Sequence, residues 1–388
     1  MSGQVKDGIL TIFFEGVIDS SNAPAVEEEI QKIVDGNKHE SLVFDFENLK
    51  YISSAGLRLV LKYKKADPTL IVINVKLEVY DVFEMTGFTK IMEVRKAYKN
   101  VSIEGCEIVG DGANGTVYRL DADTIVKVYK NPDSYDEITR ERELAKQVFV
   151  LGVPTAISYD IVKVNNCFAT VFEMIDAKSL AKILSADRKE LDRCVDLYVG
   201  LLKIIHGTSV GDANLPSIKN DVLDMVKFDK DHLPEKTAAK LEQLVVSLKD
   251  RDTLIHGDYH LKNIMIQNGE PMLIDMDTVG KGHPLFELGF MYNAYLGHSC
   301  IDRENVKNFL GIDYDTAKEF WRKSLAKYLG TNDEARIDEV EDKAKIIGYL
   351  RLLRWSTRYP ESATIQKEYV HYKEELIRLA DKYDNLEI

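Results

Sequence analysis

The sequence His256-Gly-Asp-Tyr-His-Leu-Lys-Asn263 is followed by a short apolar stretch that ends at Asp275. An aspartate, an asparagine and a second aspartate in this order suit phosphoryl transfer from a magnesium nucleotide. Asp258 would orient and deprotonate a hydroxyl group, while Asn263 and Asp275 would hold Mg²⁺ through oxygen atoms. The alternative is a polar turn whose acidic side chains only bond to the main chain. The ordered set favours the catalytic interpretation.

A glycine-rich stretch upstream places Gly110, Gly112 and Gly115 between two apolar segments. The second segment, which contains Val117, has the pattern of a strand and not of a helix. The spacing therefore favours a loop that covers nucleotide phosphates over a dinucleotide-binding turn. Lys127 follows in a β-branched run, where it would reach the α- and β-phosphates. An edge-strand lysine that only prevents aggregation is the alternative.

An acidic segment, Asp136–Val150, is expected to form the next helix. Glu141 and Glu143 are both candidates for the ion pair that would position Lys127. We expect Glu143 to be the partner, because the apolar positions after it would then surround it on the packed face. Either glutamate could instead be a solvated charge.

The strand expected over residues 167–172 runs into Glu173-Met-Ile175. Together these motifs resemble the aminoglycoside phosphotransferase and choline kinase-like family, whose signature is His-Gly-Asp, four residues, Asn, and a strand that ends in Ile-Asp. The resemblance implies an α+β, protein-kinase-like fold of two lobes, with a helical C-terminal lobe. It also implies ATP and Mg²⁺ as cofactors, and main-chain contacts of Glu173 and Ile175 with adenine.

The sequence after Asp275 distinguishes a small-molecule kinase from a protein kinase. Only eight residues separate Asp275 from Pro284, and no Ala-Pro-Glu sequence closes a long activation segment. The segment His283-Pro-Leu-Phe-Glu287-Leu resembles the family motif Asp-Pro-x-x-Asp-Leu. His283 replaces the first aspartate, and Glu287 replaces the second, which normally braces the catalytic loop. We expect that brace to survive with a longer side chain.

Strand and helix patterns alternate over the first hundred residues, which predicts a small α/β domain with a sheet covered by helices. The sequence Ile52-Ser53-Ser54-Ala-Gly56, together with a helix end at Thr86-Gly-Phe, resembles the STAS domain of anti-sigma-factor antagonists. The resemblance implies a protein partner and a regulatory phosphoserine, for which Ser54 is the candidate because Ser53 stands where the family has aspartate. A serine N-cap of the following helix is the alternative.

Composition is that of a soluble, cytoplasmic protein with two or three cores. The chain has 388 residues, is 45% hydrophobic, and contains four cysteines that are too scattered for a metal site. We see no transmembrane run and no signal peptide, so we expect no membrane partner. The net charge of −13 argues against nucleic acid and is compatible with a cationic acceptor. We expect a STAS-like domain over residues 1–97, a linker over 98–104, and a phosphotransferase domain over 105–388, with its hinge ending near 176.

The helices expected between residues 179 and 249 and after Pro284 would form the acceptor pocket. Their ranges after Pro284 are Arg303–Tyr314, Asp315–Leu329, Ile337–Tyr359 and Glu361–Tyr383. A basic set could bind an anion or be salt-bridged structure, and an aromatic set could enclose a cation or be core. The basic set comprises Arg351, Arg354 and Arg358. The aromatic set comprises Tyr292, Tyr295 and Trp355. The main hypothesis is phosphorylation of a small-molecule hydroxyl. The alternative is a signalling protein whose kinase fold phosphorylates a protein serine or only binds nucleotide.

Overall fold

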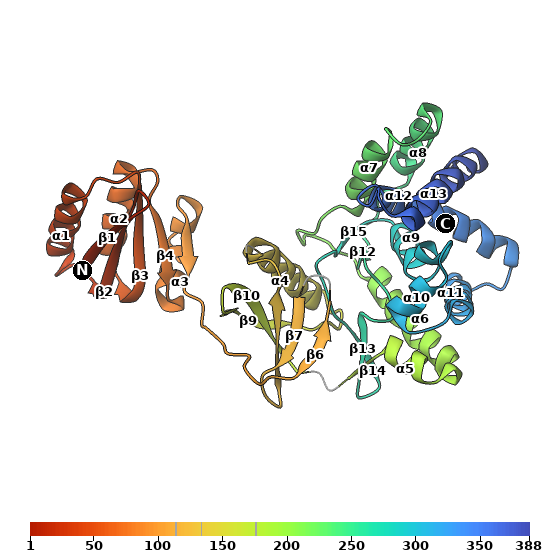
Figure 1. Cartoon of the computed structure of the whole chain (residues 1–388), viewed down its shortest axis with the longest axis horizontal. Coiled ribbons are helices and arrows are strands. Elements are labelled where there is room, and N and C mark those ends of the chain that lie inside the picture. Colours follow the sequence, from red (N-terminus) through yellow and green to blue (C-terminus); the bar gives the residue numbers. More distant parts are fainter. Residues whose placement is uncertain (113–114, 133, 175–176) are drawn as a thin grey trace. The chain divides into compact units, whose positions relative to one another are not determined.

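The computed structural model describes residues 1–112, 115–132, 134–174 and 177–388. The chain forms two compact units, drawn in Figure 1. The first comprises residues 1–105 together with 161–169, and the second comprises 106–160 together with 170–388.

The first unit is built on a five-stranded sheet of order β1-β2-β3-β4-β5, in which β1 and β2 are antiparallel and the other pairs are parallel. The strands are Ser2–Lys6, Ile9–Ile18, Ser41–Ile52, Ile71–Val75 and Val94–Lys96. Residues 42–46 of the central strand β3 are all buried, as expected for a strand covered on both faces. The predicted α/β domain is confirmed.

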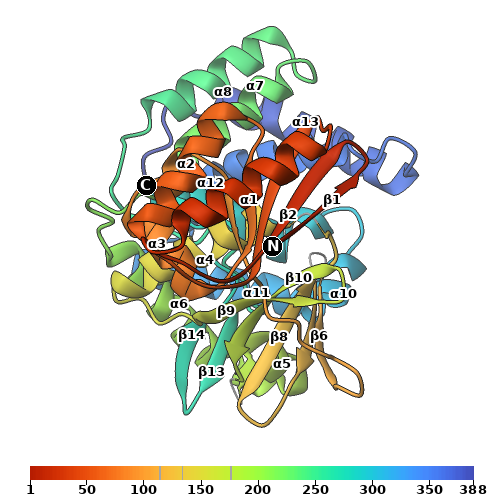
Figure 2. The same cartoon turned by 90° about the vertical axis from the view of Figure 1, so that its left-hand side faces the viewer.

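Helices α1 (Ala23–Gly36), α2 (Ser54–Ala66) and α3 (Leu77–Met85) pack on this sheet, and α1 and α2 lie side by side in Figure 2. A short 3₁₀ helix, Phe88–Lys90, follows α3. Aromatic rings fill the core, with the Phe14 centroid 4.9 Å from Phe44 and 4.8 Å from Phe46. Edge-to-face and tilted contacts of this kind add to the free energy gained by burial.

The start of α2 separates the roles of the two adjacent serines. Ser53 is the N-cap, and its hydroxyl oxygen accepts a hydrogen bond from the Ala55 N–H at 3.2 Å. Ser54 is the first residue of the helix and is exposed. The capping alternative therefore accounts for Ser53 and leaves Ser54 available at the surface.

The segment that follows β5 is held by main-chain bonds within the first unit. The Lys163 N–H donates to the Lys99 carbonyl at 2.9 Å, and the Val101 N–H donates to the Lys163 carbonyl at 2.8 Å. The ring of Tyr98 packs edge-on against Phe168, with 5.2 Å between centroids. Residues 98–101 are thus paired chain and not a free spacer.

A second five-stranded sheet has the order β6-β7-β8-β10-β9. Its strands are, in chain order, Ile108–Asp111, Gly115–Arg119, Thr124–Tyr129, Ser158–Val164 and Cys167–Glu173. Helix α4 (Tyr135–Val150) lies between β8 and β9 in the sequence. As predicted, a strand and not a helix follows the glycine-rich stretch.

The rest of the second unit is mainly helical, as predicted. Two small sheets, β11-β13-β14 and β12-β15, contain the strands that flank residues 256–263 in the sequence. Their strands are Lys178–Ser179, Ile264–Gln267 and Glu270–Leu273, and Leu254–Ile255 and Gly280–Lys281. The helices α5 to α13 are Leu180–Ala186, Leu191–Gly207, Ile218–Asp229, Glu235–Ser247, Pro284–Tyr295, Glu304–Leu310, Tyr314–Leu329, Glu334–Ser356 and Ala363–Lys382. Two 3₁₀ helices lie at Arg188–Glu190 and Gly297–Ser299.

Helices α9 and α12 form the centre of this unit. Ten of the twelve residues of α9 are buried, so this helix packs on nearly all sides. Such a helix belongs to the interior of a domain and can hold polar side chains in fixed positions. Among the residues that the structure describes, no helix is both long and apolar enough to cross a membrane.

The last residue of α7, Asp229, gives the folded protein a distinctive pH dependence. Its side chain is fully buried, and neither carboxyl oxygen has a hydrogen-bond partner among the described residues. Burial raises the pKa of Asp229 to about 8, although the charge of Arg354 opposes the shift. In the unfolded chain the same carboxyl ionises near pH 4 (about 3.9). The folded state therefore holds an extra proton between these values, and the free energy of unfolding falls as the pH rises from about 4 to about 8.

The variant Asp229→Asn keeps the shape of the side chain and removes the ionisation. Relative to the unmodified chain, we expect this variant to raise the thermal unfolding midpoint more at about pH 8.5 than at about pH 5. Circular dichroism measures the midpoint at both pH values. Asp231→Asn, an exposed neighbour, is the control and should change neither midpoint. An equal shift of the midpoint at both pH values would contradict this assignment.

Candidate active site

The loop between β12 and β13 carries the sequence His256 to Asn263, and its turn requires glycine. Gly257 has a φ of +83°, and a Cβ atom there would lie 2.4 Å from the carbonyl oxygen of Thr278. The Thr278 hydroxyl donates to the His256 carbonyl at 2.9 Å, which holds the two segments together. A side chain at residue 257 would push the loop away from Thr278.

Asp258 lies in this loop with two polar side chains beside it. Its Oδ2 is 3.3 Å from His260 Nε2 and accepts a hydrogen bond from Asn263 Nδ2 at 3.3 Å. Burial would raise the pKa of Asp258, but the hydrogen bond and charge of His260 and the charge of Arg351 outweigh burial and lower it. Asp258 is therefore an ionised carboxylate at neutral pH that can accept a hydrogen bond from a hydroxyl group.

Glu287 of α9 braces the loop from below, as predicted. Its Oε2 accepts from the His256 N–H at 2.6 Å, and its Oε1 accepts from the Gly257 N–H at 3.0 Å. The side chain is completely buried, and burial raises its pKa to about 7 against the opposing effect of the two N–H groups. On the other side of the peptide, Arg351 of α12 donates to the Gly257 carbonyl at 2.9 Å. Arg351 thus binds a main-chain carbonyl, which is a structural role but not the salt bridge that was the alternative to anion binding.

Lys127 of β8 lies between two carboxylates. Its Nζ is 3.3 Å from Glu141 Oε1 and 3.4 Å from Asp275 Oδ1. Burial alone would lower the pKa of Lys127, but the charges of Asp275 and Glu141 outweigh it and raise the pKa. Glu141 is itself fixed by the Tyr129 hydroxyl, which donates to its Oε2 at 2.8 Å. Lys127 is thus a permanently charged cation in a defined position.

The prediction that Glu143 is the partner of Lys127 is wrong. Glu143 is exposed, whereas Glu141 is in contact with the lysine. The reason is the phase of α4, whose buried face includes Ile138, Ala145 and Val148. At 100° per residue Glu141 lies in the middle of that face and Glu143 nearly opposite to it.

The glycine-rich stretch forms a hairpin over this region. Gly110 pairs with Val117, and Val117 pairs in turn with Lys127 on the next strand. A Cβ atom on Gly115 would lie 2.6 Å from the Val128 carbonyl oxygen, so only glycine fits there. The Gly112 N–H donates to the Gly115 carbonyl at 2.9 Å. The hairpin thus presents main-chain groups near Lys127.

The predicted hinge is described only in part. Glu173 is the last residue of β10, and Met174 donates from its main-chain N–H to the Asp123 carbonyl at 2.7 Å. Ile175 lies outside the described residues. The adenine contacts expected for Glu173 and Ile175 therefore stay predictions.

The residues expected to hold Mg²⁺ are neighbours, and their chemistry fits the ion. The Ile274 N–H donates to the Asn263 carbonyl at 3.0 Å, which brings Asn263 beside Asp275. Asn263 Nδ2 donates to the Asp258 carbonyl at 3.0 Å, so its amide oxygen faces away from Asp258. No cluster of three or more histidine, cysteine or acidic side chains suited to a metal occurs in the described ranges. This is compatible with Mg²⁺, which is usually held by one or two carboxylates together with substrate phosphates and water.

A cavity of about 410 Å³ adjoins the catalytic loop and is lined by Gly257. Its lining includes side chains of both charges and one aromatic side chain. The acidic residues are Asp221, Asp224 and Asp277, the basic residues are Arg140, Arg351 and Arg354, and the aromatic residue is Phe290. Burial and then the charge of Asp275 raise the pKa of Asp277 to about 6. Sequence reasoning did not single out Asp221 and Asp224, although their spacing of three residues on α7 places both on one side of a helix.

Two of the three aromatic residues belong to the core, and Trp355 is half-buried. Tyr292 and Tyr295 are buried in the interior of the unit, and their rings pack against Trp321 at centroid distances of 5.8 and 6.4 Å. Trp355 packs against His298 and Tyr359 at centroid distances of 5.0 Å each. None of these three residues lines the cavity beside the catalytic loop.

Comparison with known proteins assigns both parts of the chain. The model of the phosphotransferase enzyme family matches residues 105–320, and the model of the STAS domain matches residues 2–102. BtrV of Bordetella bronchiseptica, which is named as an anti-sigma factor antagonist, is 38% identical over 92 residues; these cover 23% of this chain and 78% of BtrV.

Solved structures with a similar fold include the GDP complex of wild-type aminoglycoside 2'-phosphotransferase-IIIa. It has 16% identity and a TM-score of 0.48, and the match covers 78% of this chain and 98% of that one. Another is a thermostable mutant of aminoglycoside phosphotransferase APH(4)-Ia in a ternary complex with ADP and hygromycin B. It has 12% identity and a TM-score of 0.49, with 71% of this chain and 93% of that one covered.

The family match extends over more than half of the chain and contains the glycine-rich hairpin, Lys127 and the catalytic loop. The chain therefore belongs to the phosphotransferase enzyme family and carries a STAS domain in its N-terminal part.

Proposed function

We propose that this chain uses ATP and Mg²⁺ to phosphorylate a hydroxyl group of a small molecule. The observation that carries the proposal is the ionised Asp258 in a loop that borders the 410 Å³ cavity. The same loop is next to the cluster of Lys127, Glu141 and Asp275, whose charges all act on the cavity residue Asp277. A nucleotide and an acceptor could therefore meet at Asp258.

Each residue has a defined task in this proposal. Asp258 accepts a hydrogen bond from the acceptor hydroxyl and takes its proton as the oxygen attacks phosphorus. Lys127, oriented by Glu141, neutralises phosphate oxygens of the nucleotide. Asn263 and Asp275 would hold the metal, which supplies further positive charge to the phosphates.

The lining of the cavity favours a charged, polar acceptor. Asp221, Asp224 and Asp277 would bind an amine, while Arg140 and Arg354 would bind an acidic group. Arg351 is already engaged by the Gly257 carbonyl. We therefore propose an acceptor that carries an amine close to its hydroxyl group.

The second candidate is a signalling role, which the exposed Ser54 at the start of α2 favours. In this case the kinase fold would phosphorylate a protein serine or only bind nucleotide, and the STAS domain would dock a protein partner. Labelled ATP offered with a metabolite extract separates the two candidates. A labelled small molecule supports the first, and labelled protein alone supports the second. In both candidates, we propose that residues 1–97 form the STAS domain, residues 98–104 the linker, and residues 105–388 the phosphotransferase domain.

The first prediction from this proposal concerns the two aspartates. Asp275→Ala should remove Mg²⁺-dependent nucleotide binding, because it deletes a metal ligand. Asp258→Ala should leave nucleotide binding nearly intact and lower turnover at least about a hundredfold, because it deletes the group that takes the proton. Calorimetric binding of a non-hydrolysable ATP analogue and a phosphorylation assay measure the two effects. Unchanged Mg²⁺-dependent affinity in Asp275→Ala would refute the metal assignment.

The second prediction uses the two glutamates of α4 as a matched pair. Glu141→Gln should lower turnover on the order of a hundredfold, because Lys127 loses the carboxylate that positions it. Glu143→Gln, two residues away and exposed, should stay within about twofold of the unmodified chain. Steady-state kinetics of both variants decide the assignment. A larger loss in Glu143→Gln would show that the observed pairing is not the active one.

The third prediction concerns Ser54. A phosphate there would lie at the N-terminus of α2, where free N–H groups and the helix dipole favour negative charge. Protein from the native host should show phosphorylation by intact-mass analysis, and Ser54→Ala should abolish it. Ser53→Ala is the control, which removes the cap and retains the modification. Unmodified protein under all growth conditions, with no partner lost in Ser54→Asp, would leave Ser54 without a regulatory role.

A further inference from the structure

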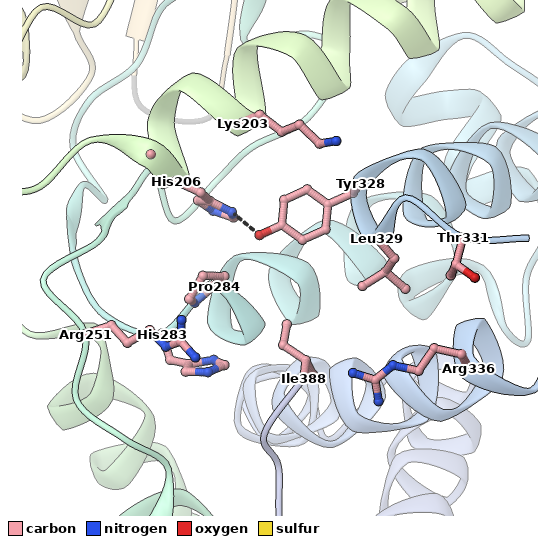
Figure 3. Close-up of a pocket in the computed structure, with 11 residues that line it drawn as sticks. Lys203, His206, Arg251, His283, Pro284, Tyr328, Leu329, Thr331, Arg336 and Ile388 are labelled. Carbon is pink, nitrogen blue, oxygen red and sulfur yellow. Dashed lines mark hydrogen bonds between the residues drawn. The ribbon is translucent and has the colours of Figure 1, made fainter. Parts of the chain in front are cut away.

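A second cavity, of about 600 Å³, lies in the helical part of the second unit (Figure 3), and its lining shares no residue with that of the cavity beside Gly257. It is formed where α6, α11 and α12 approach the segment before α9. The lining residues that the argument uses are Lys203, His206, Arg251, His283, Tyr328 and Arg336. A volume of this size is typical of small-molecule sites, which range over about 300–1,000 Å³.

Two cations approach the cavity from opposite helices. Lys203 of α6 donates to the main-chain carbonyl of Lys327 at 3.1 Å, so its charge is not cancelled by that contact. Arg336 of α12 is 2.7 Å from Glu339, but this carboxylate is also 2.7 Å from Lys343. In Figure 3 the side chains of Arg336 and Tyr328 come from two different helices and border the same space. Lys203 and Arg336 therefore bring positive charge to this cavity, in a chain whose net charge is −13.

A third cation and two histidines complete the lining. Arg251 is 3.7 Å from Glu387, and His283 Nε2 is 3.6 Å from the same carboxylate oxygen. The side chains of His206 and His283 are only 5% and 1% exposed. Among the described residues neither Nε2 atom makes a hydrogen bond of normal length, and a carboxylate oxygen lies 4.0 Å from His206 Nε2 (Glu287) and 3.6 Å from His283 Nε2 (Glu387). Buried imidazole nitrogens without a partner are costly, and a ligand oxygen would satisfy them.

Burial keeps both imidazoles neutral. It lowers the pKa of His206 to about 3 and that of His283 to about 4, with Arg251 adding to the second shift. A bound anion would reverse both effects, because it introduces a negative charge next to each ring. The cavity is thus arranged to gain protons together with an anion.

We propose that this cavity is a second small-molecule site, which binds an anion that carries a phosphate group. Guanidinium groups match the oxygens of phosphate through paired hydrogen bonds, and Lys203 adds a point charge. Pro284, Leu329 and Ile388 also line the cavity and would contact an organic part of the ligand. The ligand class is therefore a small phosphate ester or diphosphate.

The cavity is connected to the catalytic loop by a short series of contacts. His206 Nδ1 is 2.8 Å from the Tyr328 hydroxyl, and His206 Nε2 is 4.0 Å from Glu287 Oε2. That oxygen accepts the His256 N–H. His283 caps α9, the helix of Glu287, through its Nδ1, which accepts from the Leu285 N–H at 3.2 Å. A ligand that protonates His206 would place a charge beside the brace of the catalytic loop.

Binding of inorganic pyrophosphate to the full chain, measured by calorimetry without divalent metal, tests the site. We expect Arg336→Gln and Lys203→Gln each to weaken binding about tenfold or more, since each removes a charged contact. Arg193→Gln is the matched control, because Arg193 is also paired with a glutamate three residues away and lies outside the cavity. Lys127→Gln separates the nucleotide site and should retain the affinity. No binding at millimolar concentrations, equal affinity in Arg336→Gln, or loss in Lys127→Gln alone would overturn the proposal.

Histidine titration by nuclear magnetic resonance gives a readout that does not depend on variant folding. Pyrophosphate should raise the pKa of the His206 and His283 rings in the unmodified chain. The resonances of His39, which belongs to the first unit and does not line this cavity, should not respond to pyrophosphate. Unaltered titration of His206 and His283 at saturating pyrophosphate would place the anion elsewhere and overturn the assignment.

Discussion

The Glu287 carboxylate, fully buried, accepts the main-chain N–H groups of His256 and Gly257, and the position of Asp258 depends on these two hydrogen bonds. A hydrogen bond to a charged group contributes about 1.5–3 kcal/mol, and an unpaired buried carboxylate costs more than that contribution. Arg351 binds the Gly257 carbonyl from α12 at the same time. The catalytic loop is therefore clamped at its donors by α9 and at its acceptor by α12.

The contacts of this loop show which parts of the site could be predicted from the sequence. Motif spacing was sufficient to bring Asn263 and Asp275 together, because Asn263 directly precedes β13, Asp275 follows β14, and these two strands are adjacent in the chain and pair with each other. The same reasoning predicted the Glu287 brace from one motif, since a glutamate in place of aspartate keeps the carboxylate that two N–H groups require. Local patterns are reliable where the partners are close in sequence or fixed by a motif.

The choice between Glu141 and Glu143 failed because it depends on the phase of a helix against a sheet. The buried positions of α4 lie on both sides of the pair in the sequence, with Ile138 before it and Ala145 and Val148 after it. Only the complete set of buried positions determines which glutamate faces Lys127. The second cavity is a harder case, since its lining residues come from segments between residues 203 and 388. No local pattern joins them, so their common charge becomes visible only when the helices are assembled.

The two departures from the Asp-Pro-x-x-Asp motif are understood best as one change. An aspartate at residue 283 could cap α9 as His283 does, but it would add a negative charge next to Glu387 and beside the cations of the second cavity. A neutral histidine keeps the cap through Nδ1 and leaves Nε2 for a ligand. The longer Glu287 keeps the brace while His206 lies 4.0 Å from its carboxylate. The two substitutions thus preserve the hydrogen bonds of the loop and avoid a negative charge that would oppose anion binding in the second cavity. An anion bound there would change the charge of His206 and, through it, the surroundings of the Glu287 carboxylate.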